Sequence, residues 1–512
     1  MAATTSRGFY ARLITACILV LASASPLFAA NSQTSLQSQL ERAIGRQRSS
    51  QTRLALAKFY RMKSWTLAWQ DPELTHAADA ALAAAPQQGL PTGSYAAVIS
   101  ARTPVDADVE LSAQVLRYAR NVSIGVIPPA DAEGSARTLQ AIASELAVAS
   151  RNPEDLRKYL AALPPDHAAY LVLQRAYTRY LMLASQGSWP QLPLVKRIRL
   201  STPGPLAELV HTRLACEYPA LQKADPATLK EAIRRFQAHV GLTADGIIGP
   251  KTISALNIEP AQRAAQIAAN MERWRWLPRH FPTRYIEINT ANATLNAVDH
   301  DRIVLHSRVI VGKTTTSTPD FIANALAIIV NPEWDVPTSI VEKEILPHLR
   351  RQPNYLTRNH MIMKNGRVKQ LPGADNALGR LKVDITDPFA IYMHDTPART
   401  LFARDERHLS HGCIRVQKIL PLASWLLTGN VDEGLSRIQA AIDDSVTQRI
   451  SLSTPVRVYV IYRTVIVGSD GGVDFAPDIY DRDQALITAM FGAPPKLSTS
   501  KEPASHGCKV GQ

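Results

Sequence analysis

The sequence predicts a multidomain α+β protein, in which a helical N-terminal region precedes a small helical unit and a β-rich C-terminal domain with a cap-like insertion. Two observations lead to this prediction. Apolar residues recur at helical spacing from residue 31 to about residue 200, and from Tyr285 onward the apolar period changes to two. The chain has 512 residues and is 46% hydrophobic, so it can form several domains with cores of their own.

Residues 1–30 have the features of a signal peptide. Arg7 and Arg12 give a positive start, Leu13–Leu21 is an almost unbroken apolar stretch, and Ala29 and Ala30 offer a cleavage point. The apolar stretch is too short for a bilayer, which needs roughly 20 residues. We therefore expect cleavage and export, with an uncleaved anchor as the alternative. Cleavage lowers the formal net charge from +13 to 13 − 2 = +11.

Residues 31–205 predict a helical scaffold domain. Turn signals at 89–91 and 163–165 separate the helices. One apolar stripe consists of Leu111, Val115, Tyr118 and Ala119. Nothing in this region suggests catalysis.

Residues 206–257 predict a compact second unit. Asp225 followed by Pro226 is a good helix start, and Gly241 ends the helix. The apolar stripe between them consists of Leu229, Ala232, Ile233, Phe236 and Val240. Tight turns follow at 245–246 and 249–250, before a second short helix.

Residues 283–470 predict the β-rich domain. Short strands are expected at Thr294–Val298, Ile303–Val311, Ala327–Val330, Ala390–His394 and Arg457–Val467. A long segment with few strand signals, at about 335–380, interrupts them, and loops this long are uncommon unless functional. We expect it to act as a lid. Residues 492–512 are rich in Pro, Ser and Lys and predict a disordered tail.

The net charge and the number of cysteines narrow the range of possible functions. A basic chain can bind nucleic acid, an anionic membrane or an acidic polymer, but the Lys and Arg residues are scattered, which argues against nucleic acid. Cys17 leaves with the signal, so Cys216, Cys413 and Cys508 remain. An odd number of cysteines cannot all pair in disulfides within one chain. In an oxidising compartment, a thiol that stays reduced usually has a function.

The stretch Ser410-His411-Gly412-Cys413 carries the chemistry. We expect Cys413 to lie between a loop and the start of a helix, whose N-terminal partial charge favours the thiolate. His394 and His411 are both candidates for the base. Gly412 permits a tight turn, and backbone N–H groups around it and Cys413 could stabilise an oxyanion.

Three alternatives for Cys413 stay open at this point. It could be a buried small hydrophobe, or part of a zinc site with His394 and His411. It could also form a disulfide with Cys216 or Cys508.

At these residues a family resemblance becomes clear. Tyr-Met-His-Asp-Thr-Pro at 392–397 and Ser-His-Gly-Cys-Ile-Arg at 410–415 resemble the signature of the YkuD-type L,D-transpeptidase catalytic domain. Further similar positions lie upstream, at 311–313, 318–319, 331–334, 336–337 and 376–379. The run from Arg234 to Asn257 resembles a peptidoglycan-binding domain. Together the regions resemble the large L,D-transpeptidases of Gram-negative bacteria.

The resemblance implies a role for each site residue. Cys413 is implied as the nucleophile and His394 as the proton acceptor and donor. His411 and Gly412 are implied to shape the oxyanion site. Ser410 is implied to support the loop. Tyr392 and Arg415 are implied to line the substrate groove, where an Arg can bind a carboxylate in a bidentate way.

The resemblance also implies the reaction and the partners. Peptidoglycan stem peptides would acylate Cys413 with release of D-Ala, and a second stem would attack the thioester to form a 3→3 cross-link. No metal or organic cofactor is needed. Carbapenem β-lactams are implied as inhibitors, and the periplasm as the location, with peripheral association with wall synthases at the inner membrane.

Other functions stay open as alternatives. Water as acceptor would give an L,D-carboxypeptidase, and a lipoprotein lysine would give an anchoring enzyme. A non-catalytic peptidoglycan-binding scaffold and a zinc hydrolase are the other classes. In the first motif Cys413 follows His394 by 413 − 394 = 19 positions. A second Ser-His-Gly-Cys at 505–508 lacks a matching histidine, because position 508 − 19 = 489 is Ala489. We interpret it as a chance repeat in the tail.

Overall fold

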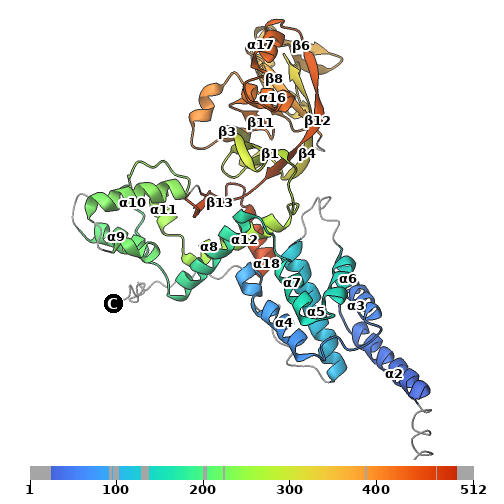
Figure 1. Cartoon of the computed structure of the whole chain (residues 1–512). Coiled ribbons are helices and arrows are strands. Elements are labelled where there is room, and N and C mark those ends of the chain that lie inside the picture. Colours follow the sequence, from blue (N-terminus) through green and yellow to red (C-terminus); the bar gives the residue numbers. More distant parts are fainter. Residues whose placement is uncertain are drawn as a thin grey trace, which may run out of the picture. The chain divides into compact units, whose positions relative to one another are not determined.

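The computed structural model describes residues 25–91, 95, 103–127, 138–199, 204–222, 225–386, 389–468 and 470–492 (Figure 1). The chain divides into two compact units, Met1–Tyr170 with Met271–Leu277, and Leu171–Asn270 with Pro278–Gln512. Residues 1–24 of the predicted signal peptide and residues 493–512 of the predicted tail, with Cys17 and Cys508, lie outside the described residues.

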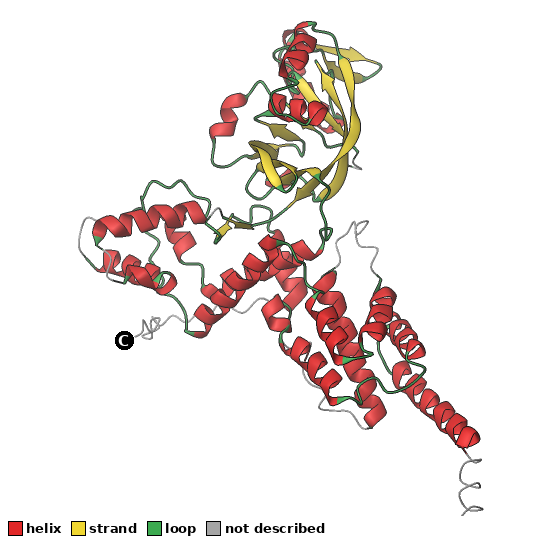
Figure 2. Ribbon diagram, in the orientation of Figure 1, coloured by secondary structure: helices red, strands yellow, loops and turns green. Residues whose placement is uncertain are grey.

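The described part of the first unit is helical, as predicted (Figure 2). Its helices are α2 (Ser25–Gly45), α3 (Ser50–Met62), α4 (Pro72–Ala83), α5 (Pro104–Ser123), α6 (Leu139–Ala149) and α7 (Pro153–Ala161). Five of them begin at a side chain that accepts a backbone N–H of the first turn, namely Ser49, Asp71, Thr103, Thr138 and Asn152. One continuous apolar core joins these helices. The helices α8 (Ala168–Ser185) and α12 (Pro260–Arg275) run across the boundaries between the units.

The small helical unit contains α9 (Pro205–Glu217), α10 (Pro226–His239) and α11 (Pro250–Leu256). The Asp225 side chain accepts the Thr228 N–H at 2.8 Å and starts α10. Phe236 is buried in the core of this unit. Its neighbour Gln237 fixes the following turn, because its amide nitrogen donates to Asp245 Oδ1 and its amide oxygen accepts the Gly246 N–H. The Phe-Gln pair therefore joins the core to the turn.

The C-terminal domain is built on a sheet that closes on itself. Within the described residues the strand order is β10-β3-β11-β9-β8-β4-β12-β1-β2, and β2 also pairs with β3. The strands are β1 (Arg284–Asn289), β2 (Thr294–Asp299), β3 (Arg302–Gly312), β4 (Phe321–Val330), β8 (Leu381–Ile385), β9 (Met393–His394), β10 (His408–Ser410), β11 (Ile414–Val416) and β12 (Gln448–Ile461). The core contains apolar residues of the strands and of the helices α16 (Ile419–Thr428) and α17 (Leu435–Asp443). The α+β fold class is confirmed.

The segment between β4 and β8 is folded rather than an open loop. It contains β5 (Trp334–Asp335), α13 (Thr338–Ile340), a π-helix (Val341–Ile345), α14 (Leu346–Arg351), α15 (Tyr355–Arg358), β6 (Met361–Lys364) and β7 (Arg367–Gln370). The strands form a small sheet in the order β5-β7-β6. Val336, Ile345 and Val368 form a core of its own. We call residues 334–379 the insert.

The chain continues beyond β12 with a further segment, residues 462–491, which we call the C-terminal segment. It contains the hairpin β13 (Val465–Val467) and β14 (Val473–Phe475), followed by α18 (Arg482–Phe491). The predicted single strand Arg457–Val467 is therefore two strands, because β12 ends at Ile461. No helix in the described part of the chain is both long and apolar enough to cross a membrane.

Candidate active site

Two short parallel strands place the segments that carry the predicted nucleophile and base side by side. In the pairing of β9 with β11, Ile414 lies opposite Met393 and Arg415 lies opposite His394. The Ile414 N–H donates to the Tyr392 carbonyl at 3.0 Å. Cys413, one residue before β11, is therefore level with Tyr392, one residue before β9. His394 and Cys413 are nineteen positions apart in the sequence, and this register leaves them two positions apart on neighbouring segments.

Tyr392 contacts the Cys413 side chain directly. Its hydroxyl forms side-chain hydrogen bonds with Cys413 and with Trp334. Burial, followed by the proximity of Cys413, raises the pKa of Tyr392 far above its ordinary value. The phenol thus keeps its proton and can donate to sulfur, while the Trp334 indole N–H, a donor only, donates to the phenol oxygen. The Tyr392 and His394 rings pack edge to face with centroids 5.6 Å apart.

His394 is a buried, neutral imidazole. Its Nδ1 lies 2.6 Å from the Asp395 carbonyl oxygen, and a carbonyl only accepts, so Nδ1 carries the proton and Nε2 has the free lone pair. Burial, together with the charges of Arg415 and Lys382, lowers the pKa of His394 to about 3. In the resting protein His394 is therefore a base and not an imidazolium.

Asp395 is held by groups other than the His394 ring. Its carboxylate accepts the Arg380 N–H at 3.1 Å and pairs with Arg399 Nη1 at 2.7 Å. Gly379 packs against it, with φ +63, and a Cβ there would lie 2.5 Å from Asp395. Only glycine permits this approach. These contacts fix the carbonyl that orients His394.

Ser410 makes two hydrogen bonds within the turn before Cys413. Its Oγ accepts the Gly412 N–H at 3.1 Å and donates to the Cys413 carbonyl at 2.6 Å. Gly412 has φ +124, a value that side-chain-bearing residues rarely adopt. Because its N–H is bonded to Ser410, Gly412 does not offer that N–H to an oxyanion in this conformation.

His411 faces the insert. Its Nε2 lies 2.8 Å from Glu344 Oε1, and both side chains are partly exposed. Glu344 belongs to the π-helix Val341–Ile345. The loop that carries Cys413 is therefore in direct contact with the insert.

Arg415 supplies positive charge beside the thiol. It lies within electrostatic range of Cys413, and burial lowers its own pKa. Among the described residues its Nε has no hydrogen-bond partner. A nearby cation favours a thiolate, and an unpaired guanidinium nitrogen can receive an anionic ligand.

The helix expected at Cys413 begins further along the chain. Ile414–Val416 is the strand β11, between β3 and β9, and α16 starts only at Ile419. The expected helix is present as α16, and its buried side chains include Ile419, Leu422, Trp425 and Leu426. The helix N-terminus is nevertheless not at Cys413, so the positive group beside the thiol is Arg415.

Two further residues contact the site. Trp334 and Thr318 lie in upstream stretches that resemble the family, at 331–334 and 318–319, but the sequence assigns them no role in the site. Trp334 is a hydrogen-bond partner of Tyr392. Thr318 donates through Oγ1 to the Gly412 carbonyl at 2.8 Å. Cys216 and Cys413 are not joined by a disulfide. Among the described residues no group of three or more His, Cys, Asp and Glu side chains could hold a metal ion.

Comparison with known families identifies the domains. Residues 283–458 match the L,D-transpeptidase catalytic domain, called YkuD. Residues 54–176 match the scaffold domain, and residues 219–256 match the family described as "Putative peptidoglycan binding domain". The closed sheet with its Cys413 site is therefore an L,D-transpeptidase catalytic domain. The chain combines it with a scaffold domain and a peptidoglycan-binding domain, as the motifs predicted.

One curated relative also matches part of this chain. A protein of Haemophilus influenzae described as "Putative L,D-transpeptidase" is 31% identical over 249 residues, which are 44% of this chain and 49% of that protein. The chain thus spans about half the length of this curated relative.

Two solved structures are also similar. "Structure of the Ldtfm-avibactam carbamoyl enzyme" is 14% identical and covers 35% of this chain and 49% of that one, with a TM-score of 0.19. The L,D-transpeptidase of Xylanimonas cellulosilytica is 17% identical, covers 53% and 98%, and has a TM-score of 0.18.

Proposed function

We propose that this protein is an L,D-transpeptidase that forms 3→3 cross-links in peptidoglycan through a thioester on Cys413. The observation that carries the proposal is the parallel register of β9 and β11, which sets Cys413 level with Tyr392, two residues before His394. A neutral His394 with a free Nε2 lone pair supports a role as general base. Arg415 supports a role in favouring the thiolate.

The first half-reaction forms the acyl-enzyme. His394 Nε2 takes the Cys413 thiol proton, and the sulfur attacks the carbonyl between the third residue of a stem, usually diaminopimelate, and the terminal D-Ala. The tetrahedral oxyanion collapses, the C–N bond breaks, and His394 returns the proton to the leaving amine. D-Ala leaves and the thioester remains.

The second half-reaction transfers the acyl group. The side-chain amine of a second stem attacks the thioester while His394 accepts its proton. The C–S bond breaks, the sulfur regains a proton from His394, and the new amide is the cross-link. The burial of His394 supports the preference for an amine over water, because a base with little contact with solvent activates bulk water poorly.

The test is a reaction with purified substrate. The protein, without residues 1–30, is incubated with a disaccharide-tetrapeptide, and the products are read by tandem mass spectrometry. We expect dimers joined between the third residues and free D-Ala. Cys413→Ala should give neither product. Cys508→Ala, in the second Ser-His-Gly-Cys, is the matched control and should react like the wild type.

The same experiment separates the alternatives. A tripeptide without dimers would point to an L,D-carboxypeptidase, and transfer only to a lysine-bearing lipopeptide would point to an anchoring enzyme. Unchanged substrate with every variant would contradict the proposal and favour a binding scaffold.

We further propose that Cys413 is acylated by carbapenems and that the enzyme acts in the periplasm, beside wall synthases at the inner membrane. The carbapenem proposal rests on the reactive thiol, since a strained β-lactam carbonyl resembles the acyl donor. Intact-protein mass spectrometry with meropenem tests it, and the mass of Cys413→Ala must stay unchanged. The location rests on the predicted signal at 1–30, and cell fractionation tests it.

A further inference from the structure

The C-terminal segment lies beyond the part of the chain that matches the catalytic family, residues 283–458. It nevertheless contacts the catalytic domain close to the nucleophile. The Tyr480 hydroxyl donates to the carbonyl of Gly312, the last residue of β3. The Tyr480 ring packs edge to face on His408 in β10, with centroids 5.4 Å apart. β10 ends at Ser410, three residues before Cys413.

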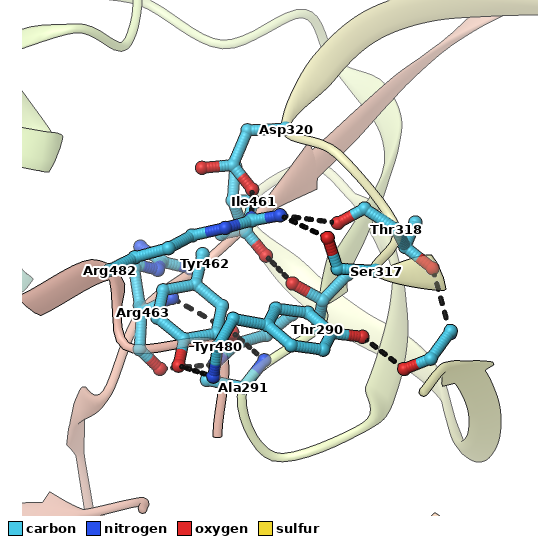
Figure 3. Close-up of polar contacts among 12 residues, drawn as sticks. Thr290, Ala291, Ser317, Thr318, Asp320, Ile461, Tyr462, Arg463, Tyr480 and Arg482 are labelled. Carbon is cyan, nitrogen blue, oxygen red and sulfur yellow. Dashed lines mark hydrogen bonds and ion pairs between the residues drawn. The ribbon is translucent and has the colours of Figure 1, made fainter. Parts of the chain in front are cut away.

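Arg482, the first residue of α18, makes the second contact. Its Nη2 donates to the Thr318 carbonyl at 2.9 Å, and its Nη1 pairs with Asp320 Oδ1 at 2.7 Å. Its guanidinium lies 5.0 and 4.8 Å from the ring centroids of Tyr462 and Tyr480. Figure 3 shows the arginine extending past both rings toward Ser317 and Thr318. Stacking and hydrogen bonds together fix a long side chain that would otherwise be mobile.

The residues that Tyr480 and Arg482 hold belong to the connection 312–320 between β3 and β4. This connection has little apolar anchorage of its own, because Lys313, Thr314 and Thr315 are exposed and Thr316 and Ser317 only half-buried. Its conformation therefore depends on hydrogen bonds. Two of its anchors, the Gly312 and Thr318 carbonyls, are bonded to the C-terminal segment.

The same connection holds the loop that carries the nucleophile. Thr318 Oγ1 accepts the Gly312 N–H at 2.9 Å and donates to the Gly412 carbonyl at 2.8 Å. The Lys313 N–H and the Thr316 hydroxyl both donate to the Ser410 carbonyl, at 2.9 and 3.1 Å. A chain of contacts thus runs from Arg482 and Tyr480 through Thr318 to the residue preceding Cys413.

We propose that Tyr480 and Arg482 are positioning residues for Cys413, acting through the 312–320 connection. The proposal rests on the proposed function, in which Cys413 is the nucleophile. Acyl transfer requires the sulfur to be aligned with Tyr392 and with the substrate carbonyl, and a displacement of about 1 Å costs a large factor in rate. Loss of the C-terminal contacts allows the connection to shift, and the loop that carries Cys413 shifts with it.

The first experiment uses substitutions that keep the packing. Tyr480→Phe removes one hydroxyl and keeps the packing of the ring. Arg482→Lys keeps the positive charge but loses the planar guanidinium group with its several N–H donors. Gln484→Ala, an exposed position on the same helix, is the control. We expect kcat for cross-linking to fall about tenfold in Tyr480→Phe, with KM within about twofold and the thermal midpoint nearly unchanged. A role in folding alone would lower the midpoint and leave kcat of the folded protein as in the wild type.

A second measurement does not depend on the cross-linking reaction. The rate constant for alkylation of Cys413 by iodoacetamide at pH 7 reports the position of the thiol relative to Tyr392 and Arg415. We expect it to fall in Tyr480→Phe and Arg482→Lys, and to stay at the wild-type value in Gln484→Ala. All variants are made in protein that also carries Cys508→Ala, so that the Cys508 thiol does not contribute to the measured alkylation.

The intermediate link is tested by a matched pair. Thr318→Val removes the hydroxyl and should lower kcat and alkylation, whereas Thr318→Ser keeps it and should restore both. If both Tyr480→Phe and Arg482→Lys keep wild-type kcat and alkylation while Thr318→Val loses them, the connection positions Cys413 without the C-terminal segment and the proposal is wrong. If the wild type forms no cross-links at all, the proposed function fails, and the alkylation series still decides the positioning.

Discussion

His411 Nε2 lies 2.8 Å from Glu344 Oε1, and this contact joins the loop that carries Cys413 to the π-helix of the insert. Both side chains are partly exposed, so the contact stabilises the folded protein by about 1 kcal/mol at most. Its effect is local: it restrains the insert next to the nucleophile.

The first prediction concerns this restraint. Glu344→Ala should speed amide hydrogen exchange in Val341–Ile345 severalfold, while the unfolding midpoint stays nearly the same, because a weak surface contact affects local opening more than global stability. Exchange mass spectrometry measures the peptide. Glu342→Ala, an exposed position of the same π-helix, is the control and should leave exchange unchanged. Equal exchange in both variants would contradict the prediction.

The second prediction concerns the Tyr392 hydroxyl. Tyr392→Phe removes the donor to Cys413 and leaves the Trp334 indole N–H without its acceptor. Loss of such a bond costs about 1–3 kcal/mol, so kcat should fall about ten- to hundredfold. Steady-state kinetics measure it. Tyr285→Phe, which removes a hydroxyl from β1 in the same sheet, should keep full activity, and an active Tyr392→Phe would remove Tyr392 from the site.

The third prediction is a dependence of stability on pH. The pKa of His394 is lowered to about 3 in the folded protein, against about 6.5 in an unfolded chain. As the pH falls below about 6.5, the unfolded chain binds this proton first, so the contribution of His394 to stability is complete above that pH and is lost progressively toward pH 3. The loss approaches about 1.4 kcal/mol per pH unit for one group.

Urea unfolding between pH 7 and pH 4.5 measures this effect. The wild type should lose stability over this range more steeply than His394→Gln, which cannot take up the proton. His300→Gln is the control, because the His300 side chain is 82% exposed, and it should follow the wild type. Parallel pH profiles for the wild type and His394→Gln would show that His394 titrates normally.

The fourth prediction concerns the support of His394. Gly379→Ala adds a Cβ 2.5 Å from Asp395 at a positive φ, so the unfolding free energy should fall by more than about 1–2 kcal/mol and kcat should fall with it. Gly366→Ala has a similar φ, +73, but nothing within 4 Å. It should carry only the backbone cost of about 1 kcal/mol and keep its kcat. Equal effects of the two substitutions on kcat would contradict a role for Asp395 in orienting His394.

Local patterns predicted much of the fold. The capping of α10 by Asp225 and the alternation that begins at Tyr285 in β1 are decided by neighbouring residues, so they can be read directly from the sequence. The strand β11 was mistaken for the approach to a helix because three residues are too few to show a period. Its strand conformation depends on pairing with β3 and β9, which the local sequence does not encode.

The site was predicted only as far as its motif extends. Tyr392, His394 and Cys413 belong to two nearby motifs, and the structure places Tyr392 against both Cys413 and the His394 ring. Trp334 reaches Tyr392 through the fold of the insert, and Tyr480 reaches Gly312 across 480 − 312 = 168 positions. Contacts of this kind depend on tertiary packing, and no spacing rule in the sequence indicates them.

The closure of the sheet depends on a pairing between strands that lie far apart in the sequence. Tyr285 in β1 pairs with Arg457 in β12, 457 − 285 = 172 positions later, and pairing over such a separation forms slowly because the entropy of loop closure must be overcome first. Cys413 precedes β12 (Gln448–Ile461) in the chain, so translation delivers the loop that carries the thiol before the strand that closes the sheet. Until β12 docks, the sheet beside that loop stays open, and the yield of folded molecules depends on how fast this step occurs.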